Sequence, residues 1–435
     1  MKIILVFCET DELFGEYRAG VFSIFESNPP LGLGAIGTIA LEYSCAVKIY
    51  DQLLLKKSRD QLIKEILNDK PDMVGFMCTS LNIANSVFCA RTIKAESAAC
   101  VFAGGIHISL CAEKVLVKNV FDFLISGEGE EIFSEILREL RNGQMIRDLK
   151  LRGLWLRDSD KNCGMAILKD INQPVINREI LNISKYKNRG ALLKETPCYS
   201  LFSSRGCSYG CKFCSKPQYF KMYRQRKIDL VIEEIKYLIT SFGAKAVSFR
   251  EDNFTIDLGR LENFCREMIK VFDGKFFWEC ESRATLPYQT LELMYKAGCR
   301  GIWCGVETTV PRWQNWINKG LATSTIVKFY DDCKAIGIAT GALFMFGFPE
   351  QTEDELNADI KFAIELPTTF SAFQCLAIFP GSMLKNYYQE NPELCAQIND
   401  EIALALTRGK SAQDMIALEQ KINRTIRSNR LSYVK

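Results

Sequence analysis

Short, fully apolar runs alternate with amphipathic stretches through residues 1–142 of the chain. The runs are "IILVF", "AVKIY", "DMVGFM", "CVFAGG" and "FDFLISG". One of the intervening stretches, "SRDQLIKEILNDK", places Leu62, Ile63 and Ile66 on one face of a helix. Because fully apolar strands that alternate with helices are typical of parallel sheets covered on both faces, the pattern predicts a doubly wound, Rossmann-like α/β domain.

The alternation is lost in residues 143–198, which we interpret as a connector with a hairpin in "GLWLRDSDKNCGMAILK". It returns in residues 199–382, where six apolar strands are separated by helical patterns. These strands start near Tyr199, Ala246, Phe276, Gly301, Gly341 and Phe373. Eight such units close a standard barrel, so this pattern predicts a partial (β/α)6 TIM barrel with its active site at the carboxyl ends of the strands. Residues 383–435 predict a short helical tail.

The composition narrows the classes of function. Lysine and arginine number 55 against 52 for aspartate and glutamate, so no strong charge favours nucleic acid or an anionic membrane surface. No run approaches the roughly 20 apolar residues of a membrane span, and the apolar start is too short for a signal peptide. We therefore expect a cytoplasmic protein whose 18 cysteines stay reduced. The single histidine, His107, argues against a Ser-His-Asp triad and a histidine-rich zinc site.

Three cysteines stand close together in the segment "SSRGCSYGCKFCSKP", residues 203–217. Cys207, Cys211 and Cys214 follow the first strand of the predicted barrel, where a loop can direct three thiolates to one site. Three thiolates leave one iron of a 4Fe–4S cluster without a protein ligand, and such an iron can bind a chelating substrate. The alternatives are three unrelated thiols or a zinc knuckle, which would need a fourth cysteine or histidine nearby.

This segment resembles the signature of the radical S-adenosylmethionine (radical SAM) superfamily, CxxxCxφC with an aromatic φ, which is Phe213 here. The catalytic domain of that superfamily is a six-unit partial barrel. The resemblance implies that Cys207, Cys211 and Cys214 hold the cluster. It also implies that the open iron chelates the amino and carboxylate groups of S-adenosylmethionine. Reductive cleavage would then release a deoxyadenosyl radical, which takes a hydrogen atom from the substrate.

Polar side chains at other strand ends resemble the superfamily's contacts to S-adenosylmethionine. Glu251 and Asp252 end the second barrel strand in "SFREDNFT" and resemble the acidic motif that meets the ammonium group. Glu281 and Arg283 follow the third strand in "WECESRA", where polar groups meet the carboxylate and the ribose. The resemblance therefore makes all four of these residues expected cofactor contacts.

Three later segments extend the resemblance. Glu307 follows the fourth strand in "WCGVETT", and Pro380 lies in "FPGSML", which resembles the adenine-side turn after the sixth strand. "GFPEQTEDE" resembles the Gly-Leu-Pro-Gly-Glu-Thr turn after the fifth strand. It departs from that turn at Glu350 and Gln351, so only the turn itself is carried over.

Residues 1–142 resemble the cobalamin-binding domain that precedes the barrel in one branch of the superfamily. The segments "PPLGLGAIGTIAL", "AGGIHIS" and "ISGEGEEIF" carry this resemblance. The expected cobalamin contacts lie at the carboxyl ends of strands and are Thr79, Ser80, Leu81, Gly104, Gly105, Gly127, Glu128 and Gly129. The alternative is a flavodoxin-like domain whose crevice is empty or holds a nucleotide.

One departure bears on the cobalt. Many cobalamin proteins carry Asp-x-His-x-x-Gly after the first strand, whereas this chain has "CETDELFG" at residues 8–15. We therefore expect a cobalt without a protein histidine and a structural or tail-pocket role for His107. The strand-three loop, with Leu81 and Asn82, is the segment that we expect to face the cobalt.

The resemblance implies a cobalamin-dependent radical SAM methyltransferase that acts on an unactivated carbon, by way of methylcobalamin and a deoxyadenosyl radical. The substrate would be a small molecule, a lipid or a peptide, and the reductant a flavodoxin or ferredoxin. One alternative is a cyclase or rearrangement enzyme with the same cofactors and no net methylation. Another is a non-catalytic iron–sulfur module that senses redox state. Methylthiotransferases are a third, but the basic, β-rich C-terminal module expected for them is absent from the sequence.

Overall fold

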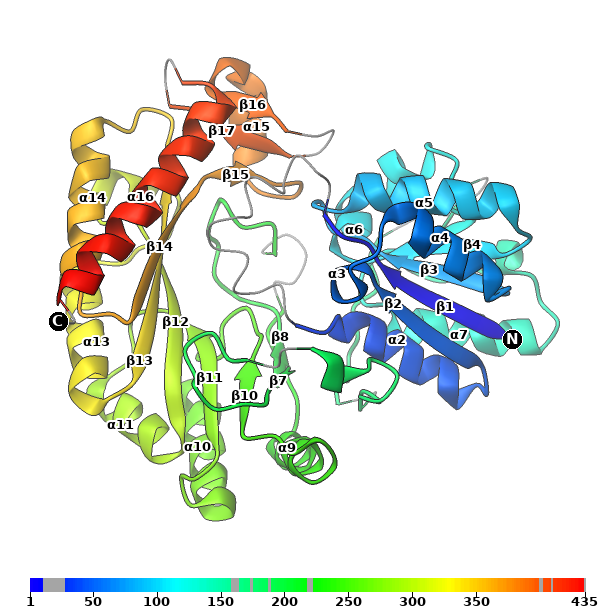
Figure 1. Ribbon diagram of the computed structural model, residues 1–435, viewed down its shortest axis with the longest axis horizontal. Coiled ribbons are helices and arrows are strands. Elements are labelled where there is room, and N and C mark those ends of the chain that lie inside the picture. Colours follow the sequence, from blue (N-terminus) through cyan, green and yellow to red (C-terminus); the bar gives the residue numbers. More distant parts are fainter. Residues whose placement is uncertain are drawn as a thin grey trace. The chain divides into compact units, whose positions relative to one another are not determined.

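The structure is a computed structural model that describes residues 1–10, 28–157, 164–172, 175–186, 189–216, 222–398, 402–407 and 410–433. The chain divides into two compact units, the first of which ends at Tyr186. Figure 1 shows the first unit mainly in blue and cyan and the second in green through red.

The first unit is built on a sheet with the strand order β2-β1-β3-β4-β5-β6. Its strands are β1 (Lys2–Phe7), β2 (Ala46–Asp51), β3 (Met73–Met77), β4 (Cys100–Gly104), β5 (Phe123–Ile125) and β6 (Leu154–Leu156). Strands β1 to β5 are parallel, and β6 runs antiparallel to β5. The five apolar runs of the sequence form the five parallel strands, so the predicted doubly wound sheet is confirmed.

Helices cover both faces of this sheet. They are α2 (Leu31–Glu42), α3 (Gln52–Leu55), α4 (Arg59–Asn68), α5 (Ile83–Glu96), α6 (Ile106–Leu116) and α7 (Gly129–Arg141), with short 3₁₀ turns η2 (Ile146–Asp148) and η3 (Ile183–Lys185). Helices α4, α5 and α6 contribute residues such as Leu62 and Ile93 to the core on one face. Helices α2 and α7 contribute Ile39 and Phe133 to the core on the other. Burial on both faces explains why the strands are apolar throughout.

The predicted connector contributes strand β6 to this sheet. The turn of the expected hairpin, at 158–163, lies outside the described residues. The Trp155 indole N–H donates to the Gly164 carbonyl (3.3 Å), so the residues on either side of that turn lie close together. Beyond Gly164 the chain forms a parallel bridge to Gly127 through Ala166. This segment therefore packs over the carboxyl end of β5.

The second unit contains the open, all-parallel sheet β7-β10-β11-β12-β13-β14. Its strands are β7 (Cys198–Leu201), β10 (Ala246–Phe249), β11 (Phe277–Ser282), β12 (Cys299–Glu307), β13 (Ala339–Phe346) and β14 (Phe370–Cys375). Its helices are α9 (Ile228–Phe242), α10 (Leu258–Phe272), α11 (Tyr288–Lys296), α12 (Pro311–Trp316), α13 (Thr323–Ile336) and α14 (Glu353–Glu365). A two-stranded ribbon of β8 (Ser204–Arg205) and β9 (Arg224–Gln225) precedes α9. The predicted six-stranded partial barrel is confirmed.

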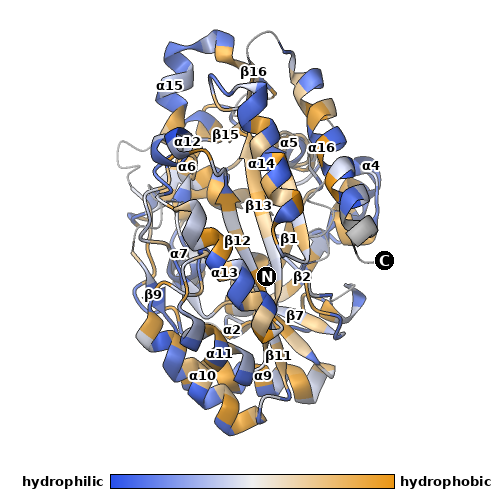
Figure 2. Ribbon diagram, turned by 90° about the vertical axis from the view of Figure 1, so that its left-hand side faces the viewer, coloured by the Kyte–Doolittle hydropathy of each residue, from blue (hydrophilic) through white to orange (hydrophobic). Residues whose placement is uncertain are grey.

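Figure 2 shows the barrel strands as pale to orange and the helices as alternating blue and orange. This is the pattern expected where amphipathic helices pack one face on an apolar sheet. Between β10, β11 and α10, the packing is aromatic: Phe249, Phe264 and Trp278 meet edge to face, with ring centroids 5.4 to 5.8 Å apart.

The tail is more varied than the predicted helical segment. It holds α15 (Leu384–Glu390), η4 (Pro392–Leu394), β16 (Cys395–Gln397), β17 (Ala403–Ala405) and α16 (Ala412–Tyr433). Strand β17 pairs antiparallel with β16 and with β15 (Ala377–Ile378). Strands of two or three residues are too short to show a period in sequence, so this small sheet was not predicted. Within the described residues, no helix is both long enough and apolar enough to span a membrane.

Helix α16 covers the outer edge of β14, the last strand of the open barrel (Figure 1). The Asn423 side chain accepts from the Phe373 N–H and donates to the Phe373 carbonyl, both at 2.9 Å. The Glu419 carboxylate accepts from the Cys375 N–H at 2.8 Å. These two side chains therefore take hydrogen bonds that a further strand would otherwise make.

We expect the stability of this contact to depend on pH through Glu419. Burial raises the pKa of this carboxyl from 4.5 to about 7, although the Cys375 N–H opposes the shift. The folded chain therefore binds the proton more tightly, and its stability falls as pH rises from about 4.5 to about 7. Glu419→Gln keeps an acceptor oxygen without the charge. Urea unfolding should show the two proteins alike at pH 4.5 and the variant about 3 kcal/mol more stable at pH 8. Equal stability at pH 8 would contradict the prediction.

Candidate functional site

The three cysteines of the predicted cluster site lie in one loop after β7. Cys211 is buried, Cys207 and Cys214 are half-buried, and all three are free thiols. The Cys214 N–H donates to the Cys211 carbonyl (3.1 Å), which folds the end of the loop into a turn. Burial raises the pKa of the Cys207 and Cys214 thiols.

The spacing of these thiols bears on the kind of metal they can hold. Among the residues that the structure describes, no three histidine, cysteine, aspartate or glutamate side chains surround a position for a single metal ion. A cubane cluster takes each of its thiolates on a different iron, so its ligands do not converge on one point. That this loop holds a cluster rather than a zinc ion stays a prediction from the sequence.

A short segment after α12 holds the cysteine loop in place. The Asn318 amide donates to the Gly210 carbonyl, and the Lys212 N–H donates to the Ile317 carbonyl, each at 2.9 Å. Asn318 adopts a left-handed backbone conformation (φ 54°), which turns the chain at this point. The sequence analysis missed this segment, because "NWINKG" indicates only the end of a helix.

Arg283 links the same segment to the loop. Its guanidinium lies 4.1 Å from the centre of the ring of Tyr209, a residue that comes between the first two cysteines in the sequence. The same guanidinium donates to the Lys319 carbonyl. Arg283 was predicted as a cofactor contact. In the structure it lies against the cysteine loop, so it is placed to act on the loop as well as on a ligand.

Glu307 ends β12 in an unusual conformation. Its φ of 69° lies in the left-handed region, and the pairing of β12 with β13 is irregular between Gly305 and Glu307. The carboxylate forms an ion pair with Lys319 (2.9 Å), and each side chain is only about a tenth exposed. A Cβ atom at Gly305 would lie 2.1 Å from a Glu307 carboxylate oxygen, so a side chain there would displace the Glu307 carboxylate.

We expect Lys319→Met to destabilise the chain by about 3 to 5 kcal/mol, because it leaves Glu307 buried and unpaired. Urea unfolding of the whole chain would measure the loss. Lys328→Met is a matched control, because Lys328 pairs with Asp332 at 2.6 Å while its side chain is 69% exposed. It should cost less than about 1 kcal/mol. Similar losses of stability in the two variants would contradict the prediction, because the buried pair would then contribute no more than the exposed one.

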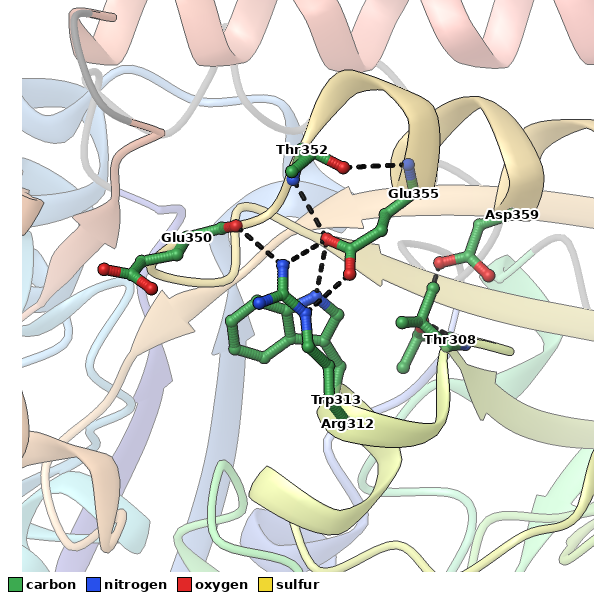
Figure 3. A network of polar contacts seen from close by, with 8 residues as sticks. Thr308, Arg312, Trp313, Glu350, Thr352, Glu355 and Asp359 are labelled. Atoms are coloured by element: carbon green, nitrogen blue, oxygen red, sulfur yellow. Dashed lines mark hydrogen bonds and ion pairs between the residues drawn. The ribbon is translucent and has the colours of Figure 1, made fainter.

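A network of polar contacts fixes the loop after Glu307 to α14 (Figure 3). Thr308 donates to Asp359 through its hydroxyl, and the Thr309 N–H donates to the same carboxylate, both at 2.7 Å. Arg312 binds both oxygens of Glu355 at 2.6 and 2.7 Å. Arg312 and the Thr352 N–H hold the pKa of Glu355 down to about 2, although its partial burial opposes this. The strand end that carries Glu307 is therefore rigidly supported.

The turn "GFPEQT" leads into this network. Thr352 and Glu355 form the capping box at the start of α14. The Gly347 N–H donates to the Gln351 side-chain oxygen (2.8 Å), within the same turn. The turn is thus stabilised by Gln351, one of the two residues at which the sequence departs from the family pattern.

The two neighbouring carboxylates at the end of β10 point to different partners. Asp252 forms an ion pair with Lys216. Asp252 raises the pKa of Cys207 and Cys214, and Lys216 lowers it, so this pair lies beside the cysteines. Glu251 is 4% exposed and accepts from the Ser203 N–H and the Ser204 hydroxyl.

Glu281 lies near the same pair. Burial raises the pKa of its carboxyl, and the charges of Arg250 and Lys216 lower it. The structure thus brings Asp252, Glu281 and Lys216 together next to the cysteine loop. Lys216 was missed from the sequence, because one lysine two residues after a cysteine carries no signal.

Two predicted contacts are apolar. Phe213 packs against the core formed by residues such as Trp313 and Ile317 and so anchors the cysteine loop. Pro380 is buried in a turn closed by the Ser382 N–H on the Phe379 carbonyl (3.2 Å).

In the first unit, glycine is required at two of the predicted positions, because another part of the backbone passes too close for a Cβ atom. Gly105 has a φ of 99°, and a Cβ there would lie 2.6 Å from the Cys78 carbonyl oxygen. Gly127 has a φ of 100°, and a Cβ would lie 2.1 Å from the Ala166 oxygen. Gly104 has more room, since its Cβ would meet nothing closer than 3.5 Å.

The neighbours of Gly127 are also engaged within the unit. Glu128 is buried and accepts from the Leu168 N–H at 2.5 Å. A Cβ at Gly129, the first residue of α7, would lie 3.1 Å from the Ile36 side chain. Gly127, Glu128 and Gly129 therefore have structural roles independent of any ligand.

The β3 and β4 loops meet at the carboxyl edge of the sheet. His107 is fully buried, and its ring Nδ1 lies 2.9 Å from the Ser80 hydroxyl. The backbone N–H of His107 donates to the Cys78 carbonyl (3.1 Å). Asn82 accepts from the Thr79 N–H (2.7 Å) and is 1% exposed, and the expectation that this loop faces the cobalt stays a prediction. Its amide stabilises the loop, and the half-buried Leu81 stays the candidate.

Comparison with known families assigns both units. Residues 201–363 match the radical SAM superfamily, and residues 17–137 match the B12 binding domain. The chain joins a B12 binding domain to a radical SAM domain. The radical SAM match contains the cysteine loop, and the B12 binding match contains the Ser80 and Gly104 strand ends.

Relatives share this two-domain organisation over most of the chain. An uncharacterized methyltransferase of Pyrococcus horikoshii is 28% identical over 395 residues, which cover 89% of this chain and 83% of the relative. An anaerobic magnesium-protoporphyrin IX monomethyl ester cyclase of Rubrivivax gelatinosus is 24% identical, covering 80% of this chain and 64% of the relative. The radical S-adenosylmethionine methyltransferase TsrM of Kitasatospora setae, solved with cobalamin and a [4Fe-4S] cluster, has a TM-score of 0.75 at 16% identity, over 98% of this chain and 88% of that one.

Proposed function

We propose that the chain is a cobalamin-dependent radical SAM methyltransferase that acts on an unactivated carbon. One observation carries the proposal: a three-cysteine loop at the carboxyl end of the first barrel strand, in the same chain as a B12 binding domain. Two of the similar proteins described above, from Pyrococcus and Kitasatospora, are named as methyltransferases. When bound, the cluster, S-adenosylmethionine and cobalamin would together supply hydrogen abstraction and methyl transfer.

The cysteine loop fits a cluster with three protein ligands. Cys207, Cys211 and Cys214 are free thiols in one loop; burial raises the pKa of Cys207 and Cys214, and the charge of Lys216 beside them opposes that shift. Asp252, Glu281 and Arg283 surround the loop and would bind the charged groups of S-adenosylmethionine. Glu307, held by Lys319, would bind its ribose.

The carboxyl edge of the first unit fits cobalamin less directly. Gly104 has no side chain, so a flat ligand could come close to the backbone there. Thr79, Ser80 and Leu81 at the end of β3 would line the same crevice. Gly105 and Glu128 would shape it through the contacts already described.

His107 is expected to leave the cobalt untouched. Its ring is fully buried and bonded to Ser80, so His107→Ala should leave the absorption spectrum of bound hydroxocobalamin unchanged. Ser80→Ala, which removes the partner, is the matched control. A spectral shift in His107→Ala alone would place the imidazole on the cobalt.

The reaction is tested with methyl-labelled S-adenosylmethionine and candidate small molecules, lipids and peptides. One label per product, with deoxyadenosine and S-adenosylhomocysteine formed alongside, supports the proposal. A product with a new ring and no label would instead support the cyclase alternative, which the Rubrivivax relative favours. Failure to form deoxyadenosine under any reductant, flavodoxin and ferredoxin included, would favour a redox-sensing module. A cytoplasmic location, where thiols stay reduced, is part of the proposal.

A further inference from the structure

Buried charged side chains grip the chain just before the cysteine loop. The Arg226 guanidinium donates to the Phe202 carbonyl (2.8 Å) and the Arg226 N–H to the Ser203 carbonyl (2.9 Å). Arg260, on α10, donates to the same Ser203 carbonyl at 2.9 Å. The junction between β7 and the loop is therefore held from α10 and from the short segment between β9 and α9, and not only by the sheet.

Glu251 holds the same junction from the other side. One of its carboxylate oxygens accepts from the Ser203 N–H and the other from the Ser204 hydroxyl. The charge of Arg260 favours the ionised form of Glu251 and so lowers its pKa, although burial raises it more. Both peptide groups of Ser203 are thus bound by charged side chains, four residues before Cys207.

The side chains that hold this junction are all of charged residue types and almost fully buried. Arg226, Glu234, Glu251 and Arg260 are between 4% and 9% exposed, and Arg226 forms an ion pair with Glu234 at 2.6 Å. Four such charges are costly to bury, and apolar residues of similar size would often stabilise a fold as well. We therefore look for their role in the position that they impose on the loop.

Among the described residues, some N–H groups of Arg226 and Arg260 have no hydrogen-bond partner. Within the part of the chain that the structure describes, the Nε and Nη2 atoms of Arg226 and the Nε and Nη1 atoms of Arg260 are buried without a protein partner. Water molecules can take these positions. The guanidinium groups are thus set by their bonds to the Phe202 and Ser203 carbonyls, not by optimal ion pairing.

We propose that Arg226, Arg260 and Glu251 form a clamp that positions the cysteine loop, leaving Asp252 as the acidic side chain of this strand end that meets S-adenosylmethionine. The inference rests on the proposed function. Arg260 and Arg226 are positioning residues that act through Ser203. Glu251, expected from sequence to contact the cofactor, acts on the loop instead.

The test compares variants of the full chain after anaerobic reconstitution with iron and sulfide. Arg260→Met should lower iron content at least twofold or change the electron paramagnetic resonance (EPR) signal of the reduced cluster. Arg260→Lys, which keeps one donor for Ser203, should recover part of the loss. Arg266→Met is the matched control, because Arg266 lies on the same helix with a side chain 63% exposed. Circular dichroism and cobalamin binding report whether each variant is folded.

Two further variants separate the neighbouring carboxylates. Glu251→Gln should resemble Arg260→Met, because it weakens the clamp. Asp252→Asn should keep the iron content and weaken S-adenosylmethionine binding at least tenfold, as followed by the EPR change on binding. The clamp is refuted if Arg260→Met and Arg260→Lys both match Arg266→Met, or if the two carboxylate variants exchange their effects. Failure of the unaltered chain to hold a cluster would instead refute the proposed function.

Discussion

Anaerobic reconstitution of this chain should yield about four irons and four sulfides, and the triple variant C207A/C211A/C214A should hold none. The three thiols are the free cysteines of one loop at the carboxyl end of β7, beside Asp252 and Lys216. Without them, the reduced chain should form no deoxyadenosine. Iron and sulfide analysis, with product chromatography, measures both losses.

Buried cysteines elsewhere in the barrel provide the control. Cys304 on β12 is 1% exposed, and burial raises the pKa of its thiol. It lies on β12, outside the cysteine loop of residues 207–214. Cys304→Ala should therefore keep a full cluster. Iron retained in the triple variant would mean that other cysteines bind it.

Preparing the chain without cobalamin should separate the two half-reactions. Deoxyadenosine should still form, because the cysteine loop and its neighbouring charges all belong to the second unit. Methyl transfer to the substrate should stop completely, because the B12 binding match lies in the first 137 residues. Labelled product and deoxyadenosine would be quantified in the same reaction.

Adding hydroxocobalamin back should restore methylation, which controls for damage during preparation. The cysteine triple variant loaded with cobalamin should form neither product. Methylation that persists without cobalamin would contradict the assignment of the methyl donor. Loss of deoxyadenosine on cobalamin removal would show that the barrel chemistry depends on the first unit.

The parts of the fold that could be predicted are those with a local signal. Parallel strands buried on both faces are continuous apolar runs, so each parallel strand of the two large sheets was found within a few residues, whereas the antiparallel β6 was expected only as part of a connector hairpin. The cysteine loop was equally visible, because its three cysteines lie within eight residues of one another. Phe213 was found by the same spacing.

The contacts between distant residues could not be predicted. Nothing local distinguishes Glu251 from Asp252, yet one binds Ser203 and the other Lys216. The partner of Glu307 is a lysine on a different loop. Gly127 was predicted as a cofactor contact, and its closeness to Ala166, which leaves no room for a Cβ, has no local signal. Such pairings depend on the path of the whole chain, which single-sequence patterns do not contain.

A barrel that stops at six strands leaves a row of peptide groups open at each of its two edge strands, and here two side chains of α16 bond to part of the row on β14. Glu419 and Asn423 are four residues apart, so a single face of one helix suffices. Tail sequences can therefore drift widely in evolution while these two positions are kept. Because one helix makes these contacts, loss of α16 after a protease cut would expose the edge of β14. A second chain could then pair with that edge, which is the first step of fibril growth.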